Sequence, residues 1–223
     1  MPPWSAADDT GRARHRASRT PAADRQSGAG WRPPPRRDAR RPACYNLPWT
    51  GGASMDDLQQ FRRGKDDFFR SHPDSPLTAD QRRSFAGLRY FPANPALDLA
   101  LNLEPYEPAT EVEIQTTTGE VRIYERFGRI AFTVDGRRVG LTVYRSEDEF
   151  FLPFADSLAG SETYGAGRYL EPEPLADGRL HVDFNLAYNP YCAYNARWSC
   201  PITPAENRLP VAIRAGEMTF QHD

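Results

Sequence analysis

Residues 111–145 carry the clearest pattern in the chain, an alternation of apolar and polar positions with a period of two. This alternation predicts half-buried β-strands, because successive side chains of a strand point to opposite faces of its sheet. Asp135-Gly136 is a strong signal for a two-residue type I′ hairpin turn. That turn would place Val134 opposite Arg137, Phe132 opposite Val139 and Ile130 opposite Leu141. We therefore predict an antiparallel meander with one buried face.

A second tight turn is predicted at Thr118-Gly119, within the segment EVEIQTTTGEVRIYE. A two-residue loop at this position would place Ile114 opposite Ile123 and Thr116 opposite Val121. Both hairpins would then present apolar residues on one face. A slip of one residue would turn those side chains to the other face, so the register matters.

The segments before the meander have helical spacing instead. In SMDDLQQFRRGKDDFF, residues 54–69, the recurring positions are Leu58, Phe61, Lys65 and Phe68, with Phe69 beside them. Ser54 and Asp57 have the arrangement of a capped helix start. In TADQRRSFAGL, residues 78–88, Thr78 and Gln81 have capping-box spacing and Gly87 is the expected stop.

Further short strands are expected after the meander. Their predicted ranges are 149–154, 167–171, 179–186, 209–214 and 217–220. Short antiparallel strands that follow two helices predict a mainly β (α+β) fold. We expect an antiparallel β-sandwich or partly open barrel with a short N-terminal helical extension.

Charge divides the chain into two parts. Residues 1–54 hold ten Arg and four Asp, a net charge of +6, whereas residues 55–223 have a net charge of −8. The first part is rich in Pro, Arg and Ala and lacks periodicity, so we expect it to be a disordered tail. Three readings stay open: upstream sequence before a true start at Met55, a plain tail, or a basic arm. Residues 55–223 are expected to form a single globular domain.

The expected surroundings follow from composition. No apolar run approaches the ~18–20 residues of a membrane span, and the N-terminus lacks the apolar core of a signal peptide. We expect a cytoplasmic protein without a membrane partner. Lys65 is the only lysine, so the abundance of arginine resembles a genomic bias, and a nucleic-acid partner is not favoured.

Two neighbouring segments gather candidate site residues. If residues 180–186 form a strand, Asp183 and Asn185 share the face opposite the core, together with His181. That face would be either solvated or covered by the aromatic segment that follows. In TYGAGRYL, Arg168 could pair with Asp183 or Glu162, or clamp an anionic ligand. The predicted ligand-binding residues are Tyr164, Arg168, Asp183, Asn185, Tyr188 and Asn189.

The cysteines leave several alternatives open. Cys44 lies in the tail, and Cys192 and Cys200 are separated by seven residues, unlike the short spacing of zinc knuckles. A metal site with His181 and Asp183, a disulfide, a nucleophilic thiol with His181 as base, and buried thiols in aromatic packing are the readings. We favour the last, predict no metal site, and find no signal that names a cofactor.

Three long stretches carry a family resemblance: PFADSLAGSETYGAGRYLEP, DFNLAYNPYCAYNARWSCP and ENRLPVAIRAGE. They resemble the signature of domain of unknown function 1684, which occurs in bacterial and archaeal proteins, and KDDFF and SPLT resemble its opening. The resemblance spans about residues 56–220 and implies kinship without a mechanism. The signature residues are Asp156, Thr163, Tyr164, Gly167, Arg168, Tyr169, Asp183, Asn185, Tyr188, Asn189, Cys192, Cys200, Pro201, Asn207 and Glu217.

Three functions are compatible with the sequence. The first is a small-molecule binding domain in which Arg168 anchors an anionic ligand, Asp183 and Asn185 orient it, and Tyr164 and Tyr188 wall it. The second is a hydrolase with Asp183 as general base and His181 or Glu217 as partner. The third is a non-catalytic interaction module whose polar cluster is structural. A concave pocket would favour the first two, and a filled, hydrogen-bonded cluster the third.

Overall fold

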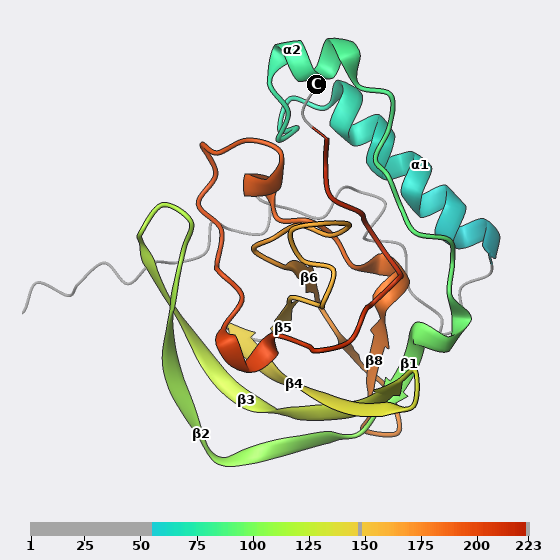
Figure 1. The fold of residues 1–223 in the computed structure, drawn as a ribbon. Coiled ribbons are helices and arrows are strands. Elements are labelled where there is room, and N and C mark those ends of the chain that lie inside the picture. The colour runs from blue at the N-terminus through green and yellow to red at the C-terminus, as the bar shows by residue number, and fades with distance from the viewer. Residues whose placement is uncertain (1–54, 147–148, 222–223) are drawn as a thin grey trace, which may run out of the picture. The chain divides into compact units, whose positions relative to one another are not determined.

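The computed structural model describes residues 55–146 and 149–221, which belong to one compact unit. The predictions for residues 1–54 and the capping role of Ser54 lie outside these residues. Two helices come first, α1 (Met55–Ser71) and α2 (Ala79–Ser84). The strands follow (Figure 1): β1 (Asp98–Leu101), β2 (Leu103–Gln115), β3 (Val121–Val134), β4 (Arg137–Ser146), β5 (Glu149–Phe154), β6 (Arg168–Leu170), β7 (Glu173–Pro174) and β8 (Leu180–Asp183).

The helices form where the spacing predicted them. α1 buries Leu58, Lys65 and Phe69 on one face. The capping box of α2 is confirmed, because Thr78 Oγ1 accepts from Gln81 N at 3.2 Å and Gln81 Oε1 accepts from Thr78 N at 2.8 Å. However, α2 ends at Ser84 instead of at Gly87. The next residue, Phe85, is extended and its ring stacks on Phe69 at 6.1 Å, so packing ends the helix early.

The strands form two antiparallel sheets. The larger has the order β2-β3-β4-β5-β6, and the smaller has the order β1-β8-β7. The predicted class is confirmed: a mainly β, antiparallel fold with a short helical N-terminus. Since β2 and β6 are opposite ends of the larger sheet, the described strands do not close into a barrel.

The second hairpin has the predicted register. Asp135 and Gly136 have φ values of +47° and +75°, as a type I′ turn requires. The paired residues are Val134 with Arg137, Phe132 with Val139 and Ile130 with Leu141. A short turn with its own backbone preference therefore fixed this pairing.

The first hairpin differs by one residue from the prediction. Ile114 lies opposite Arg122 and Glu113 lies opposite Ile123. Thr116 N donates to Glu120 O at 2.7 Å, so the loop has three residues and not two. As a result Ile123 is 49% exposed, and its neighbour Tyr124 is buried instead.

The C-terminal part forms less strand than predicted. Strand β8 ends at Asp183, because the Asp183 carboxylate accepts from Asn185 N and starts a 3-10 turn, η3 (Phe184–Leu186). The predicted strands at 209–214 and 217–220 were wrong: the first stretch has no strand pairing, and the second has only an isolated bridge at Glu217. Pro210 has no N–H group to donate to a neighbouring strand. Farther along, buried side chains make the hydrogen bonds of the backbone instead.

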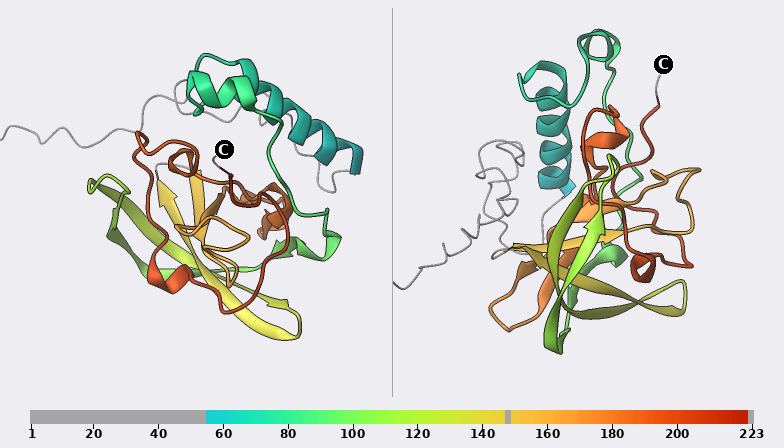
Figure 2. Two further views of the ribbon diagram at one scale, coloured as in Figure 1. Left: turned by 45° about the horizontal axis from the view of Figure 1, so that its top comes forward. Right: turned by 90° about the vertical axis from the view of Figure 1, so that its left-hand side faces the viewer.

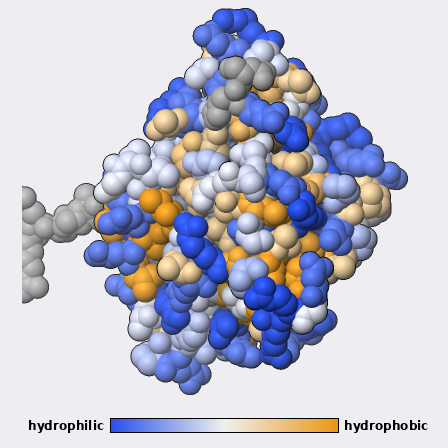
Figure 3. Space-filling model, in the orientation of Figure 1, coloured by the Kyte–Doolittle hydropathy of each residue, from blue (hydrophilic) through white to orange (hydrophobic). Residues whose placement is uncertain are grey.

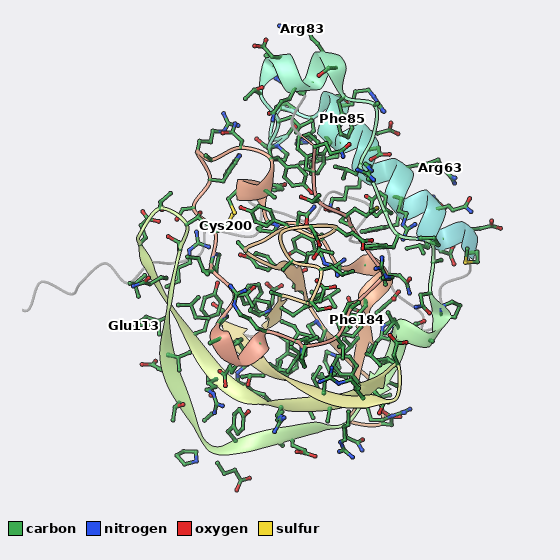
Figure 4. The ribbon with its side chains drawn as sticks, in the orientation of Figure 1. Arg63, Arg83, Phe85, Glu113, Phe184 and Cys200 are labelled. Atoms are coloured by element: carbon green, nitrogen blue, oxygen red, sulfur yellow. The ribbon has the colours of Figure 1, made fainter. Side chains whose placement is uncertain are left out.

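The C-terminal segment lies between the helices and the larger sheet. Figures 1 and 2 show α1 and α2 on the far side of the orange and red chain from β2, β3 and β4. The main core joins residues of both sheets, such as Ile130 of β3 and Val182 of β8, with Phe184 of η3 and Ile213 of this segment. In Figure 4, Phe184 points into the space above β4. A second cluster around Phe69 and Tyr194 attaches the helices.

Large apolar side chains are rarely exposed among the described residues. Those that are exposed are Met55, Val121, Ile123 and Ile202. Figure 3 shows one face of the molecule, on which apolar residues are interspersed with hydrophilic ones. None of the described helices is both long enough and apolar enough to span a membrane.

Candidate functional site

Arg168 is the centre of the residues that the signature brings together. It is the first residue of β6 and is only 1% exposed. Its guanidinium donates to three carbonyl oxygens of the C-terminal segment. These are Ala215 O at 2.5 Å, Ile213 O at 2.8 Å and Glu217 O at 2.9 Å. Arg168 therefore supplies the donors that a neighbouring strand would otherwise give to this segment.

Asp156 is the acidic partner of Arg168. Its Oδ2 lies 3.5 Å from Arg168 Nη2 and accepts from Ile213 N at 2.8 Å, while its Oδ1 accepts from Thr163 Oγ1 at 2.7 Å. The predicted ion pairs of Arg168 were wrong, since Asp156 occupies the place of Asp183 or Glu162. Glu162 pairs instead with Arg214 at the surface.

Burial weakens the positive charge of Arg168 without removing it. Desolvation lowers the pKa of Arg168 to about 10, and the charges of Asp156 and Glu217 oppose this shift. Arg168 stays protonated at neutral pH. A charged arginine held by a carboxylate and three carbonyl groups matches a structural ion pair.

A second buried ion pair lies beside the first. Lys65 of α1, which is 2% exposed, donates to Glu217 Oε1, and Glu217 is 1% exposed. The other oxygen of Glu217 accepts from Tyr194 Oη at 2.5 Å and from Asn189 N at 2.9 Å. Burial, the largest single effect, acts to lower the pKa of Lys65, but the charge and hydrogen bond of Glu217, together with Tyr90 and Tyr191, raise the pKa overall. The only lysine of the chain thus anchors α1.

Asp183 and Asn185 form a separate buried group. Asp183 Oδ1 accepts from Asn185 N at 2.9 Å and from Asn185 Nδ2 at 2.8 Å. Asn185 Oδ1 accepts from Asn94 N at 2.7 Å, and its Nδ2 donates to Asn94 O at 2.9 Å. Desolvation raises the pKa of Asp183. These contacts join the segment before β1 to the end of β8.

The proposed partners of Asp183 in hydrolysis are engaged by other groups. His181 Nε2 is 2.6 Å from Asp98 Oδ1, and Asp98 is the residue opposite Asp183 in the β1–β8 pairing. Glu217 is occupied by Lys65, Tyr194 and Asn189. Since Asp183 itself is 7% exposed, a water molecule and a substrate could not reach it together without local opening.

The remaining predicted residues divide by exposure. Asn189 is 2% exposed, and its Nδ2 donates to Met218 O at 2.8 Å, while its Oδ1 is a buried acceptor without a partner among the described residues. Tyr188 and Tyr164 are half-buried. Tyr188 Oη donates to Glu171 Oε1, and Tyr164 Oη donates to Cys192 Sγ at 3.6 Å.

The thiols lie at this partly exposed side. Cys192 is half-buried, Cys200 is 7% exposed and both are free. Cys192 N donates to Cys200 Sγ at 3.3 Å. The described residues contain no group of three His, Cys, Asp or Glu side chains arranged to hold a metal ion. The prediction that the two cysteines do not form a zinc site remains for experiment.

Sequence reasoning missed the roles of Lys65 and Asn94. Lys65 stood on the otherwise apolar stripe of a predicted helix, which is the signal that a charged side chain is buried and paired. Asn94 lies in a proline-rich connection, and no local pattern links it to Asn185 across 91 positions.

The fold and the site together define a mainly antiparallel α+β domain whose signature residues form buried hydrogen-bonded clusters. A family model described as "Protein of unknown function (DUF1684)" matches residues 83–218, and the chain belongs to this family. The KDDFF and SPLT stretches lie before the matched range. No curated protein of described function is similar to the chain at a significant level.

A solved structure is similar as well. It is a solution NMR structure of an uncharacterized protein from Haloarcula marismortui, with 37% sequence identity and a TM-score of 0.58. The similarity covers 74% of this chain and 93% of the archaeal chain.

Proposed function

We propose that the protein is a non-catalytic interaction module and that the polar cluster of the signature is structural. One observation carries this proposal. Arg168, the side chain best suited to clamp an anion, is 1% exposed and donates to three carbonyl groups beside Asp156. An incoming carboxylate or phosphate would have to replace contacts that hold the C-terminal segment in place.

The other charged members of the cluster support the same proposal. Lys65 and Glu217 neutralise each other, and Asp183 is held by Asn185. Groups that are buried and already hydrogen-bonded stabilise a fold and are poor sites for exchange with solutes. A partner would therefore contact residues outside these buried groups. The half-buried members of the signature are Tyr164, Tyr188 and Cys192.

An anion titration distinguishes this proposal from ligand binding at Arg168. The melting temperature would be measured with phosphate, acetate and citrate, each against sodium chloride of equal ionic strength. We expect equal shifts for each anion and its chloride reference. A saturable stabilisation of several degrees by one anion, lost in Tyr188→Phe, would support the binding domain instead. That variant keeps the aromatic ring and the buried charges.

The hydrolase alternative needs its own test. The protein would be assayed with p-nitrophenyl esters and phosphates, next to Asp183→Asn. We expect no turnover above buffer from either. Turnover that disappears in Asp183→Asn while the variant stays folded, as judged by circular dichroism, would refute the non-catalytic proposal.

A further inference from the structure

Cys192 and Cys200 are a pair of contacting thiols that the structural cluster does not use. Cys192 lies in the 3-10 turn η4 (Tyr191–Ala193), and Cys200 follows eight positions later, directly before Pro201. The backbone N–H of Cys192 donates to Cys200 Sγ at 3.3 Å, so the second thiol lies directly against the residue that carries the first. Figure 4 shows the sulfur atoms beside η4, close to the label of Cys200.

Backbone contacts hold both cysteines in place. Thr117 N donates to Cys200 O at 2.9 Å, and Cys200 N donates to Thr117 Oγ1 at 3.2 Å. On the other side, Ala193 N donates to Pro190 O at 2.9 Å and closes the turn that carries Cys192. The hairpin loop and η4 thus fix the two residues independently and keep Cys200 Sγ against the backbone of Cys192.

The two thiols have different surroundings. Cys192 is the more exposed, and Tyr164 Oη donates to its sulfur at 3.6 Å. The hydrogen bond with Cys200, followed by that of Tyr164, lowers the pKa of Cys192 to about 7 against the opposing effect of burial. The same bond and burial raise the pKa of Cys200. A reachable thiolate beside a protonated, buried thiol is the arrangement that thiol–disulfide exchange requires.

We propose that Cys192 and Cys200 form a reversible redox site, which closes to an intramolecular disulfide by exchange with a small-molecule disulfide. In the first step the Cys192 thiolate attacks one sulfur of the small disulfide. A mixed disulfide forms, and the other half leaves as a thiolate. In the second step Cys200 gives up its proton and attacks the Cys192 sulfur, which releases the second half as a thiol. Two protein thiols are oxidised and one small disulfide is reduced to two thiols.

The disulfide would tether a loop that contacts the helices. Between the two cysteines, Tyr194 O accepts from Gln81 Nε2 at 2.8 Å, and Trp198 Nε1 donates to Pro76 O at 3.4 Å. The redox state would therefore set how firmly residues 192–200 hold the helical layer. This proposal does not depend on whether the Arg168 cluster is structural.

The test uses the full chain, reduced and then exposed to oxidised glutathione. Remaining thiols would be alkylated with iodoacetamide, and linked peptides identified by mass spectrometry. We expect two thiols to become protected, a peptide joining Cys192 to Cys200, and complete reversal by dithiothreitol. Cys44→Ser, the control for the third cysteine, should behave in the same way. The proposal would be overturned if Cys192 and Cys200 both stayed open to alkylation, or if every disulfide found included Cys44.

Two variants and a pH profile test the order of attack. Cys200→Ser should retain one glutathione on Cys192, whereas Cys192→Ser should leave Cys200 unmodified. If either variant fails to fold, the pH dependence of alkylation in the wild-type protein decides which thiol attacks first. The rate of alkylation at Cys192 should rise about tenfold per pH unit below pH 7 and level off above it, because only the thiolate reacts. A midpoint near 8.5, the ordinary cysteine pKa, or faster alkylation of Cys200 would contradict the assigned roles.

Discussion

At the scale of single residues, the signature supplies buried charges that replace missing strand contacts. Arg168 and Asp156 have side chains that are 1% and 0% exposed, and together they hold the N–H of Ile213 and three carbonyl groups of the C-terminal segment. Backbone groups without partners are costly in a protein interior. These two side chains therefore explain how the backbone of residues 213–217 finds hydrogen-bond partners in the interior without pairing as a strand.

This arrangement predicts energetic coupling between Arg168 and Asp156. Arg168→Met should cost about 3–5 kcal/mol in the free energy of unfolding, because it leaves the Asp156 charge unpaired. Arg168→Met combined with Asp156→Asn should cost clearly less than the sum of the single changes. Urea unfolding of the four proteins measures the coupling. Arg214→Met is the control, since its exposed ion pair with Glu162 should contribute less than ~1 kcal/mol.

An additive result would show that the two residues act separately. The parallel cycle with Asp183→Asn should be additive, because the Asp183 carboxylate accepts hydrogen bonds from Asn185 and not from Arg168. The sequence identified Arg168 as a site residue from its position in the signature. Its carbonyl partners could not be predicted, since they come from positions 45 to 49 residues away that no local pattern connects.

At the scale of elements, Gly167 lets the backbone just before β6 pass close to Thr203 and to the end of β5. It has a φ of +102°, and a Cβ atom there would lie 2.1 Å from Thr203 Oγ1 and 2.7 Å from Phe154 O. Backbone atoms cannot move aside without shifting β5. Glycine at this position is therefore required by both conformation and space.

The matched glycine at position 165 makes this testable. Gly167→Ala should destabilise the protein by more than ~2 kcal/mol, since it adds steric overlap to the strain of a positive φ. Gly165→Ala should change stability by less than ~1 kcal/mol, because its nearest contacts are at 3.7 Å and 3.8 Å. Thermal unfolding of both variants provides the comparison. Equal losses would mean that close approach at Gly167 is not a constraint.

Elements were predictable where the determining signals are local. The Asp135-Gly136 turn carries its own backbone preference, so its hairpin had the correct register. The Thr118-Gly119 turn fits loops of two or three residues, and the contact of Thr117 with Cys200 favours the longer loop in the folded chain. For residues 209–214 the alternation of apolar positions correctly indicates which side chains are buried. It does not indicate that hydrogen bonds from side chains would take the place of those between paired strands.

At the scale of the molecule, one buried ion pair links helix α1 to the C-terminal segment that lies against the sheets. Lys65 lies in α1 and Glu217 in the C-terminal segment, 152 positions apart in the chain. Glu217 N also donates to Ala187 O at 2.9 Å, and its carboxylate binds Tyr194 and Asn189. Glu217 is therefore the point where α1, the loop after β8 and the C-terminal segment meet.

Replacing Lys65 should loosen α1 before it unfolds the sheets. Lys65→Met removes the charge but keeps most of the apolar length, and it leaves the Glu217 carboxylate with the donors Asn189 N and Tyr194 Oη alone. We expect a loss of about 3–5 kcal/mol for an unpaired buried charge. Hydrogen exchange should quicken in α1 more than in β3 and β4, since the sheet core does not contain Lys65.

The matched control is Arg63→Met. The side chain of Arg63 projects from the outer side of α1 in Figure 4, so this variant should leave exchange in α1 unchanged. If both variants gave the same exchange in α1, the ion pair would not be what holds the helix, and packing around Phe69 would take that role.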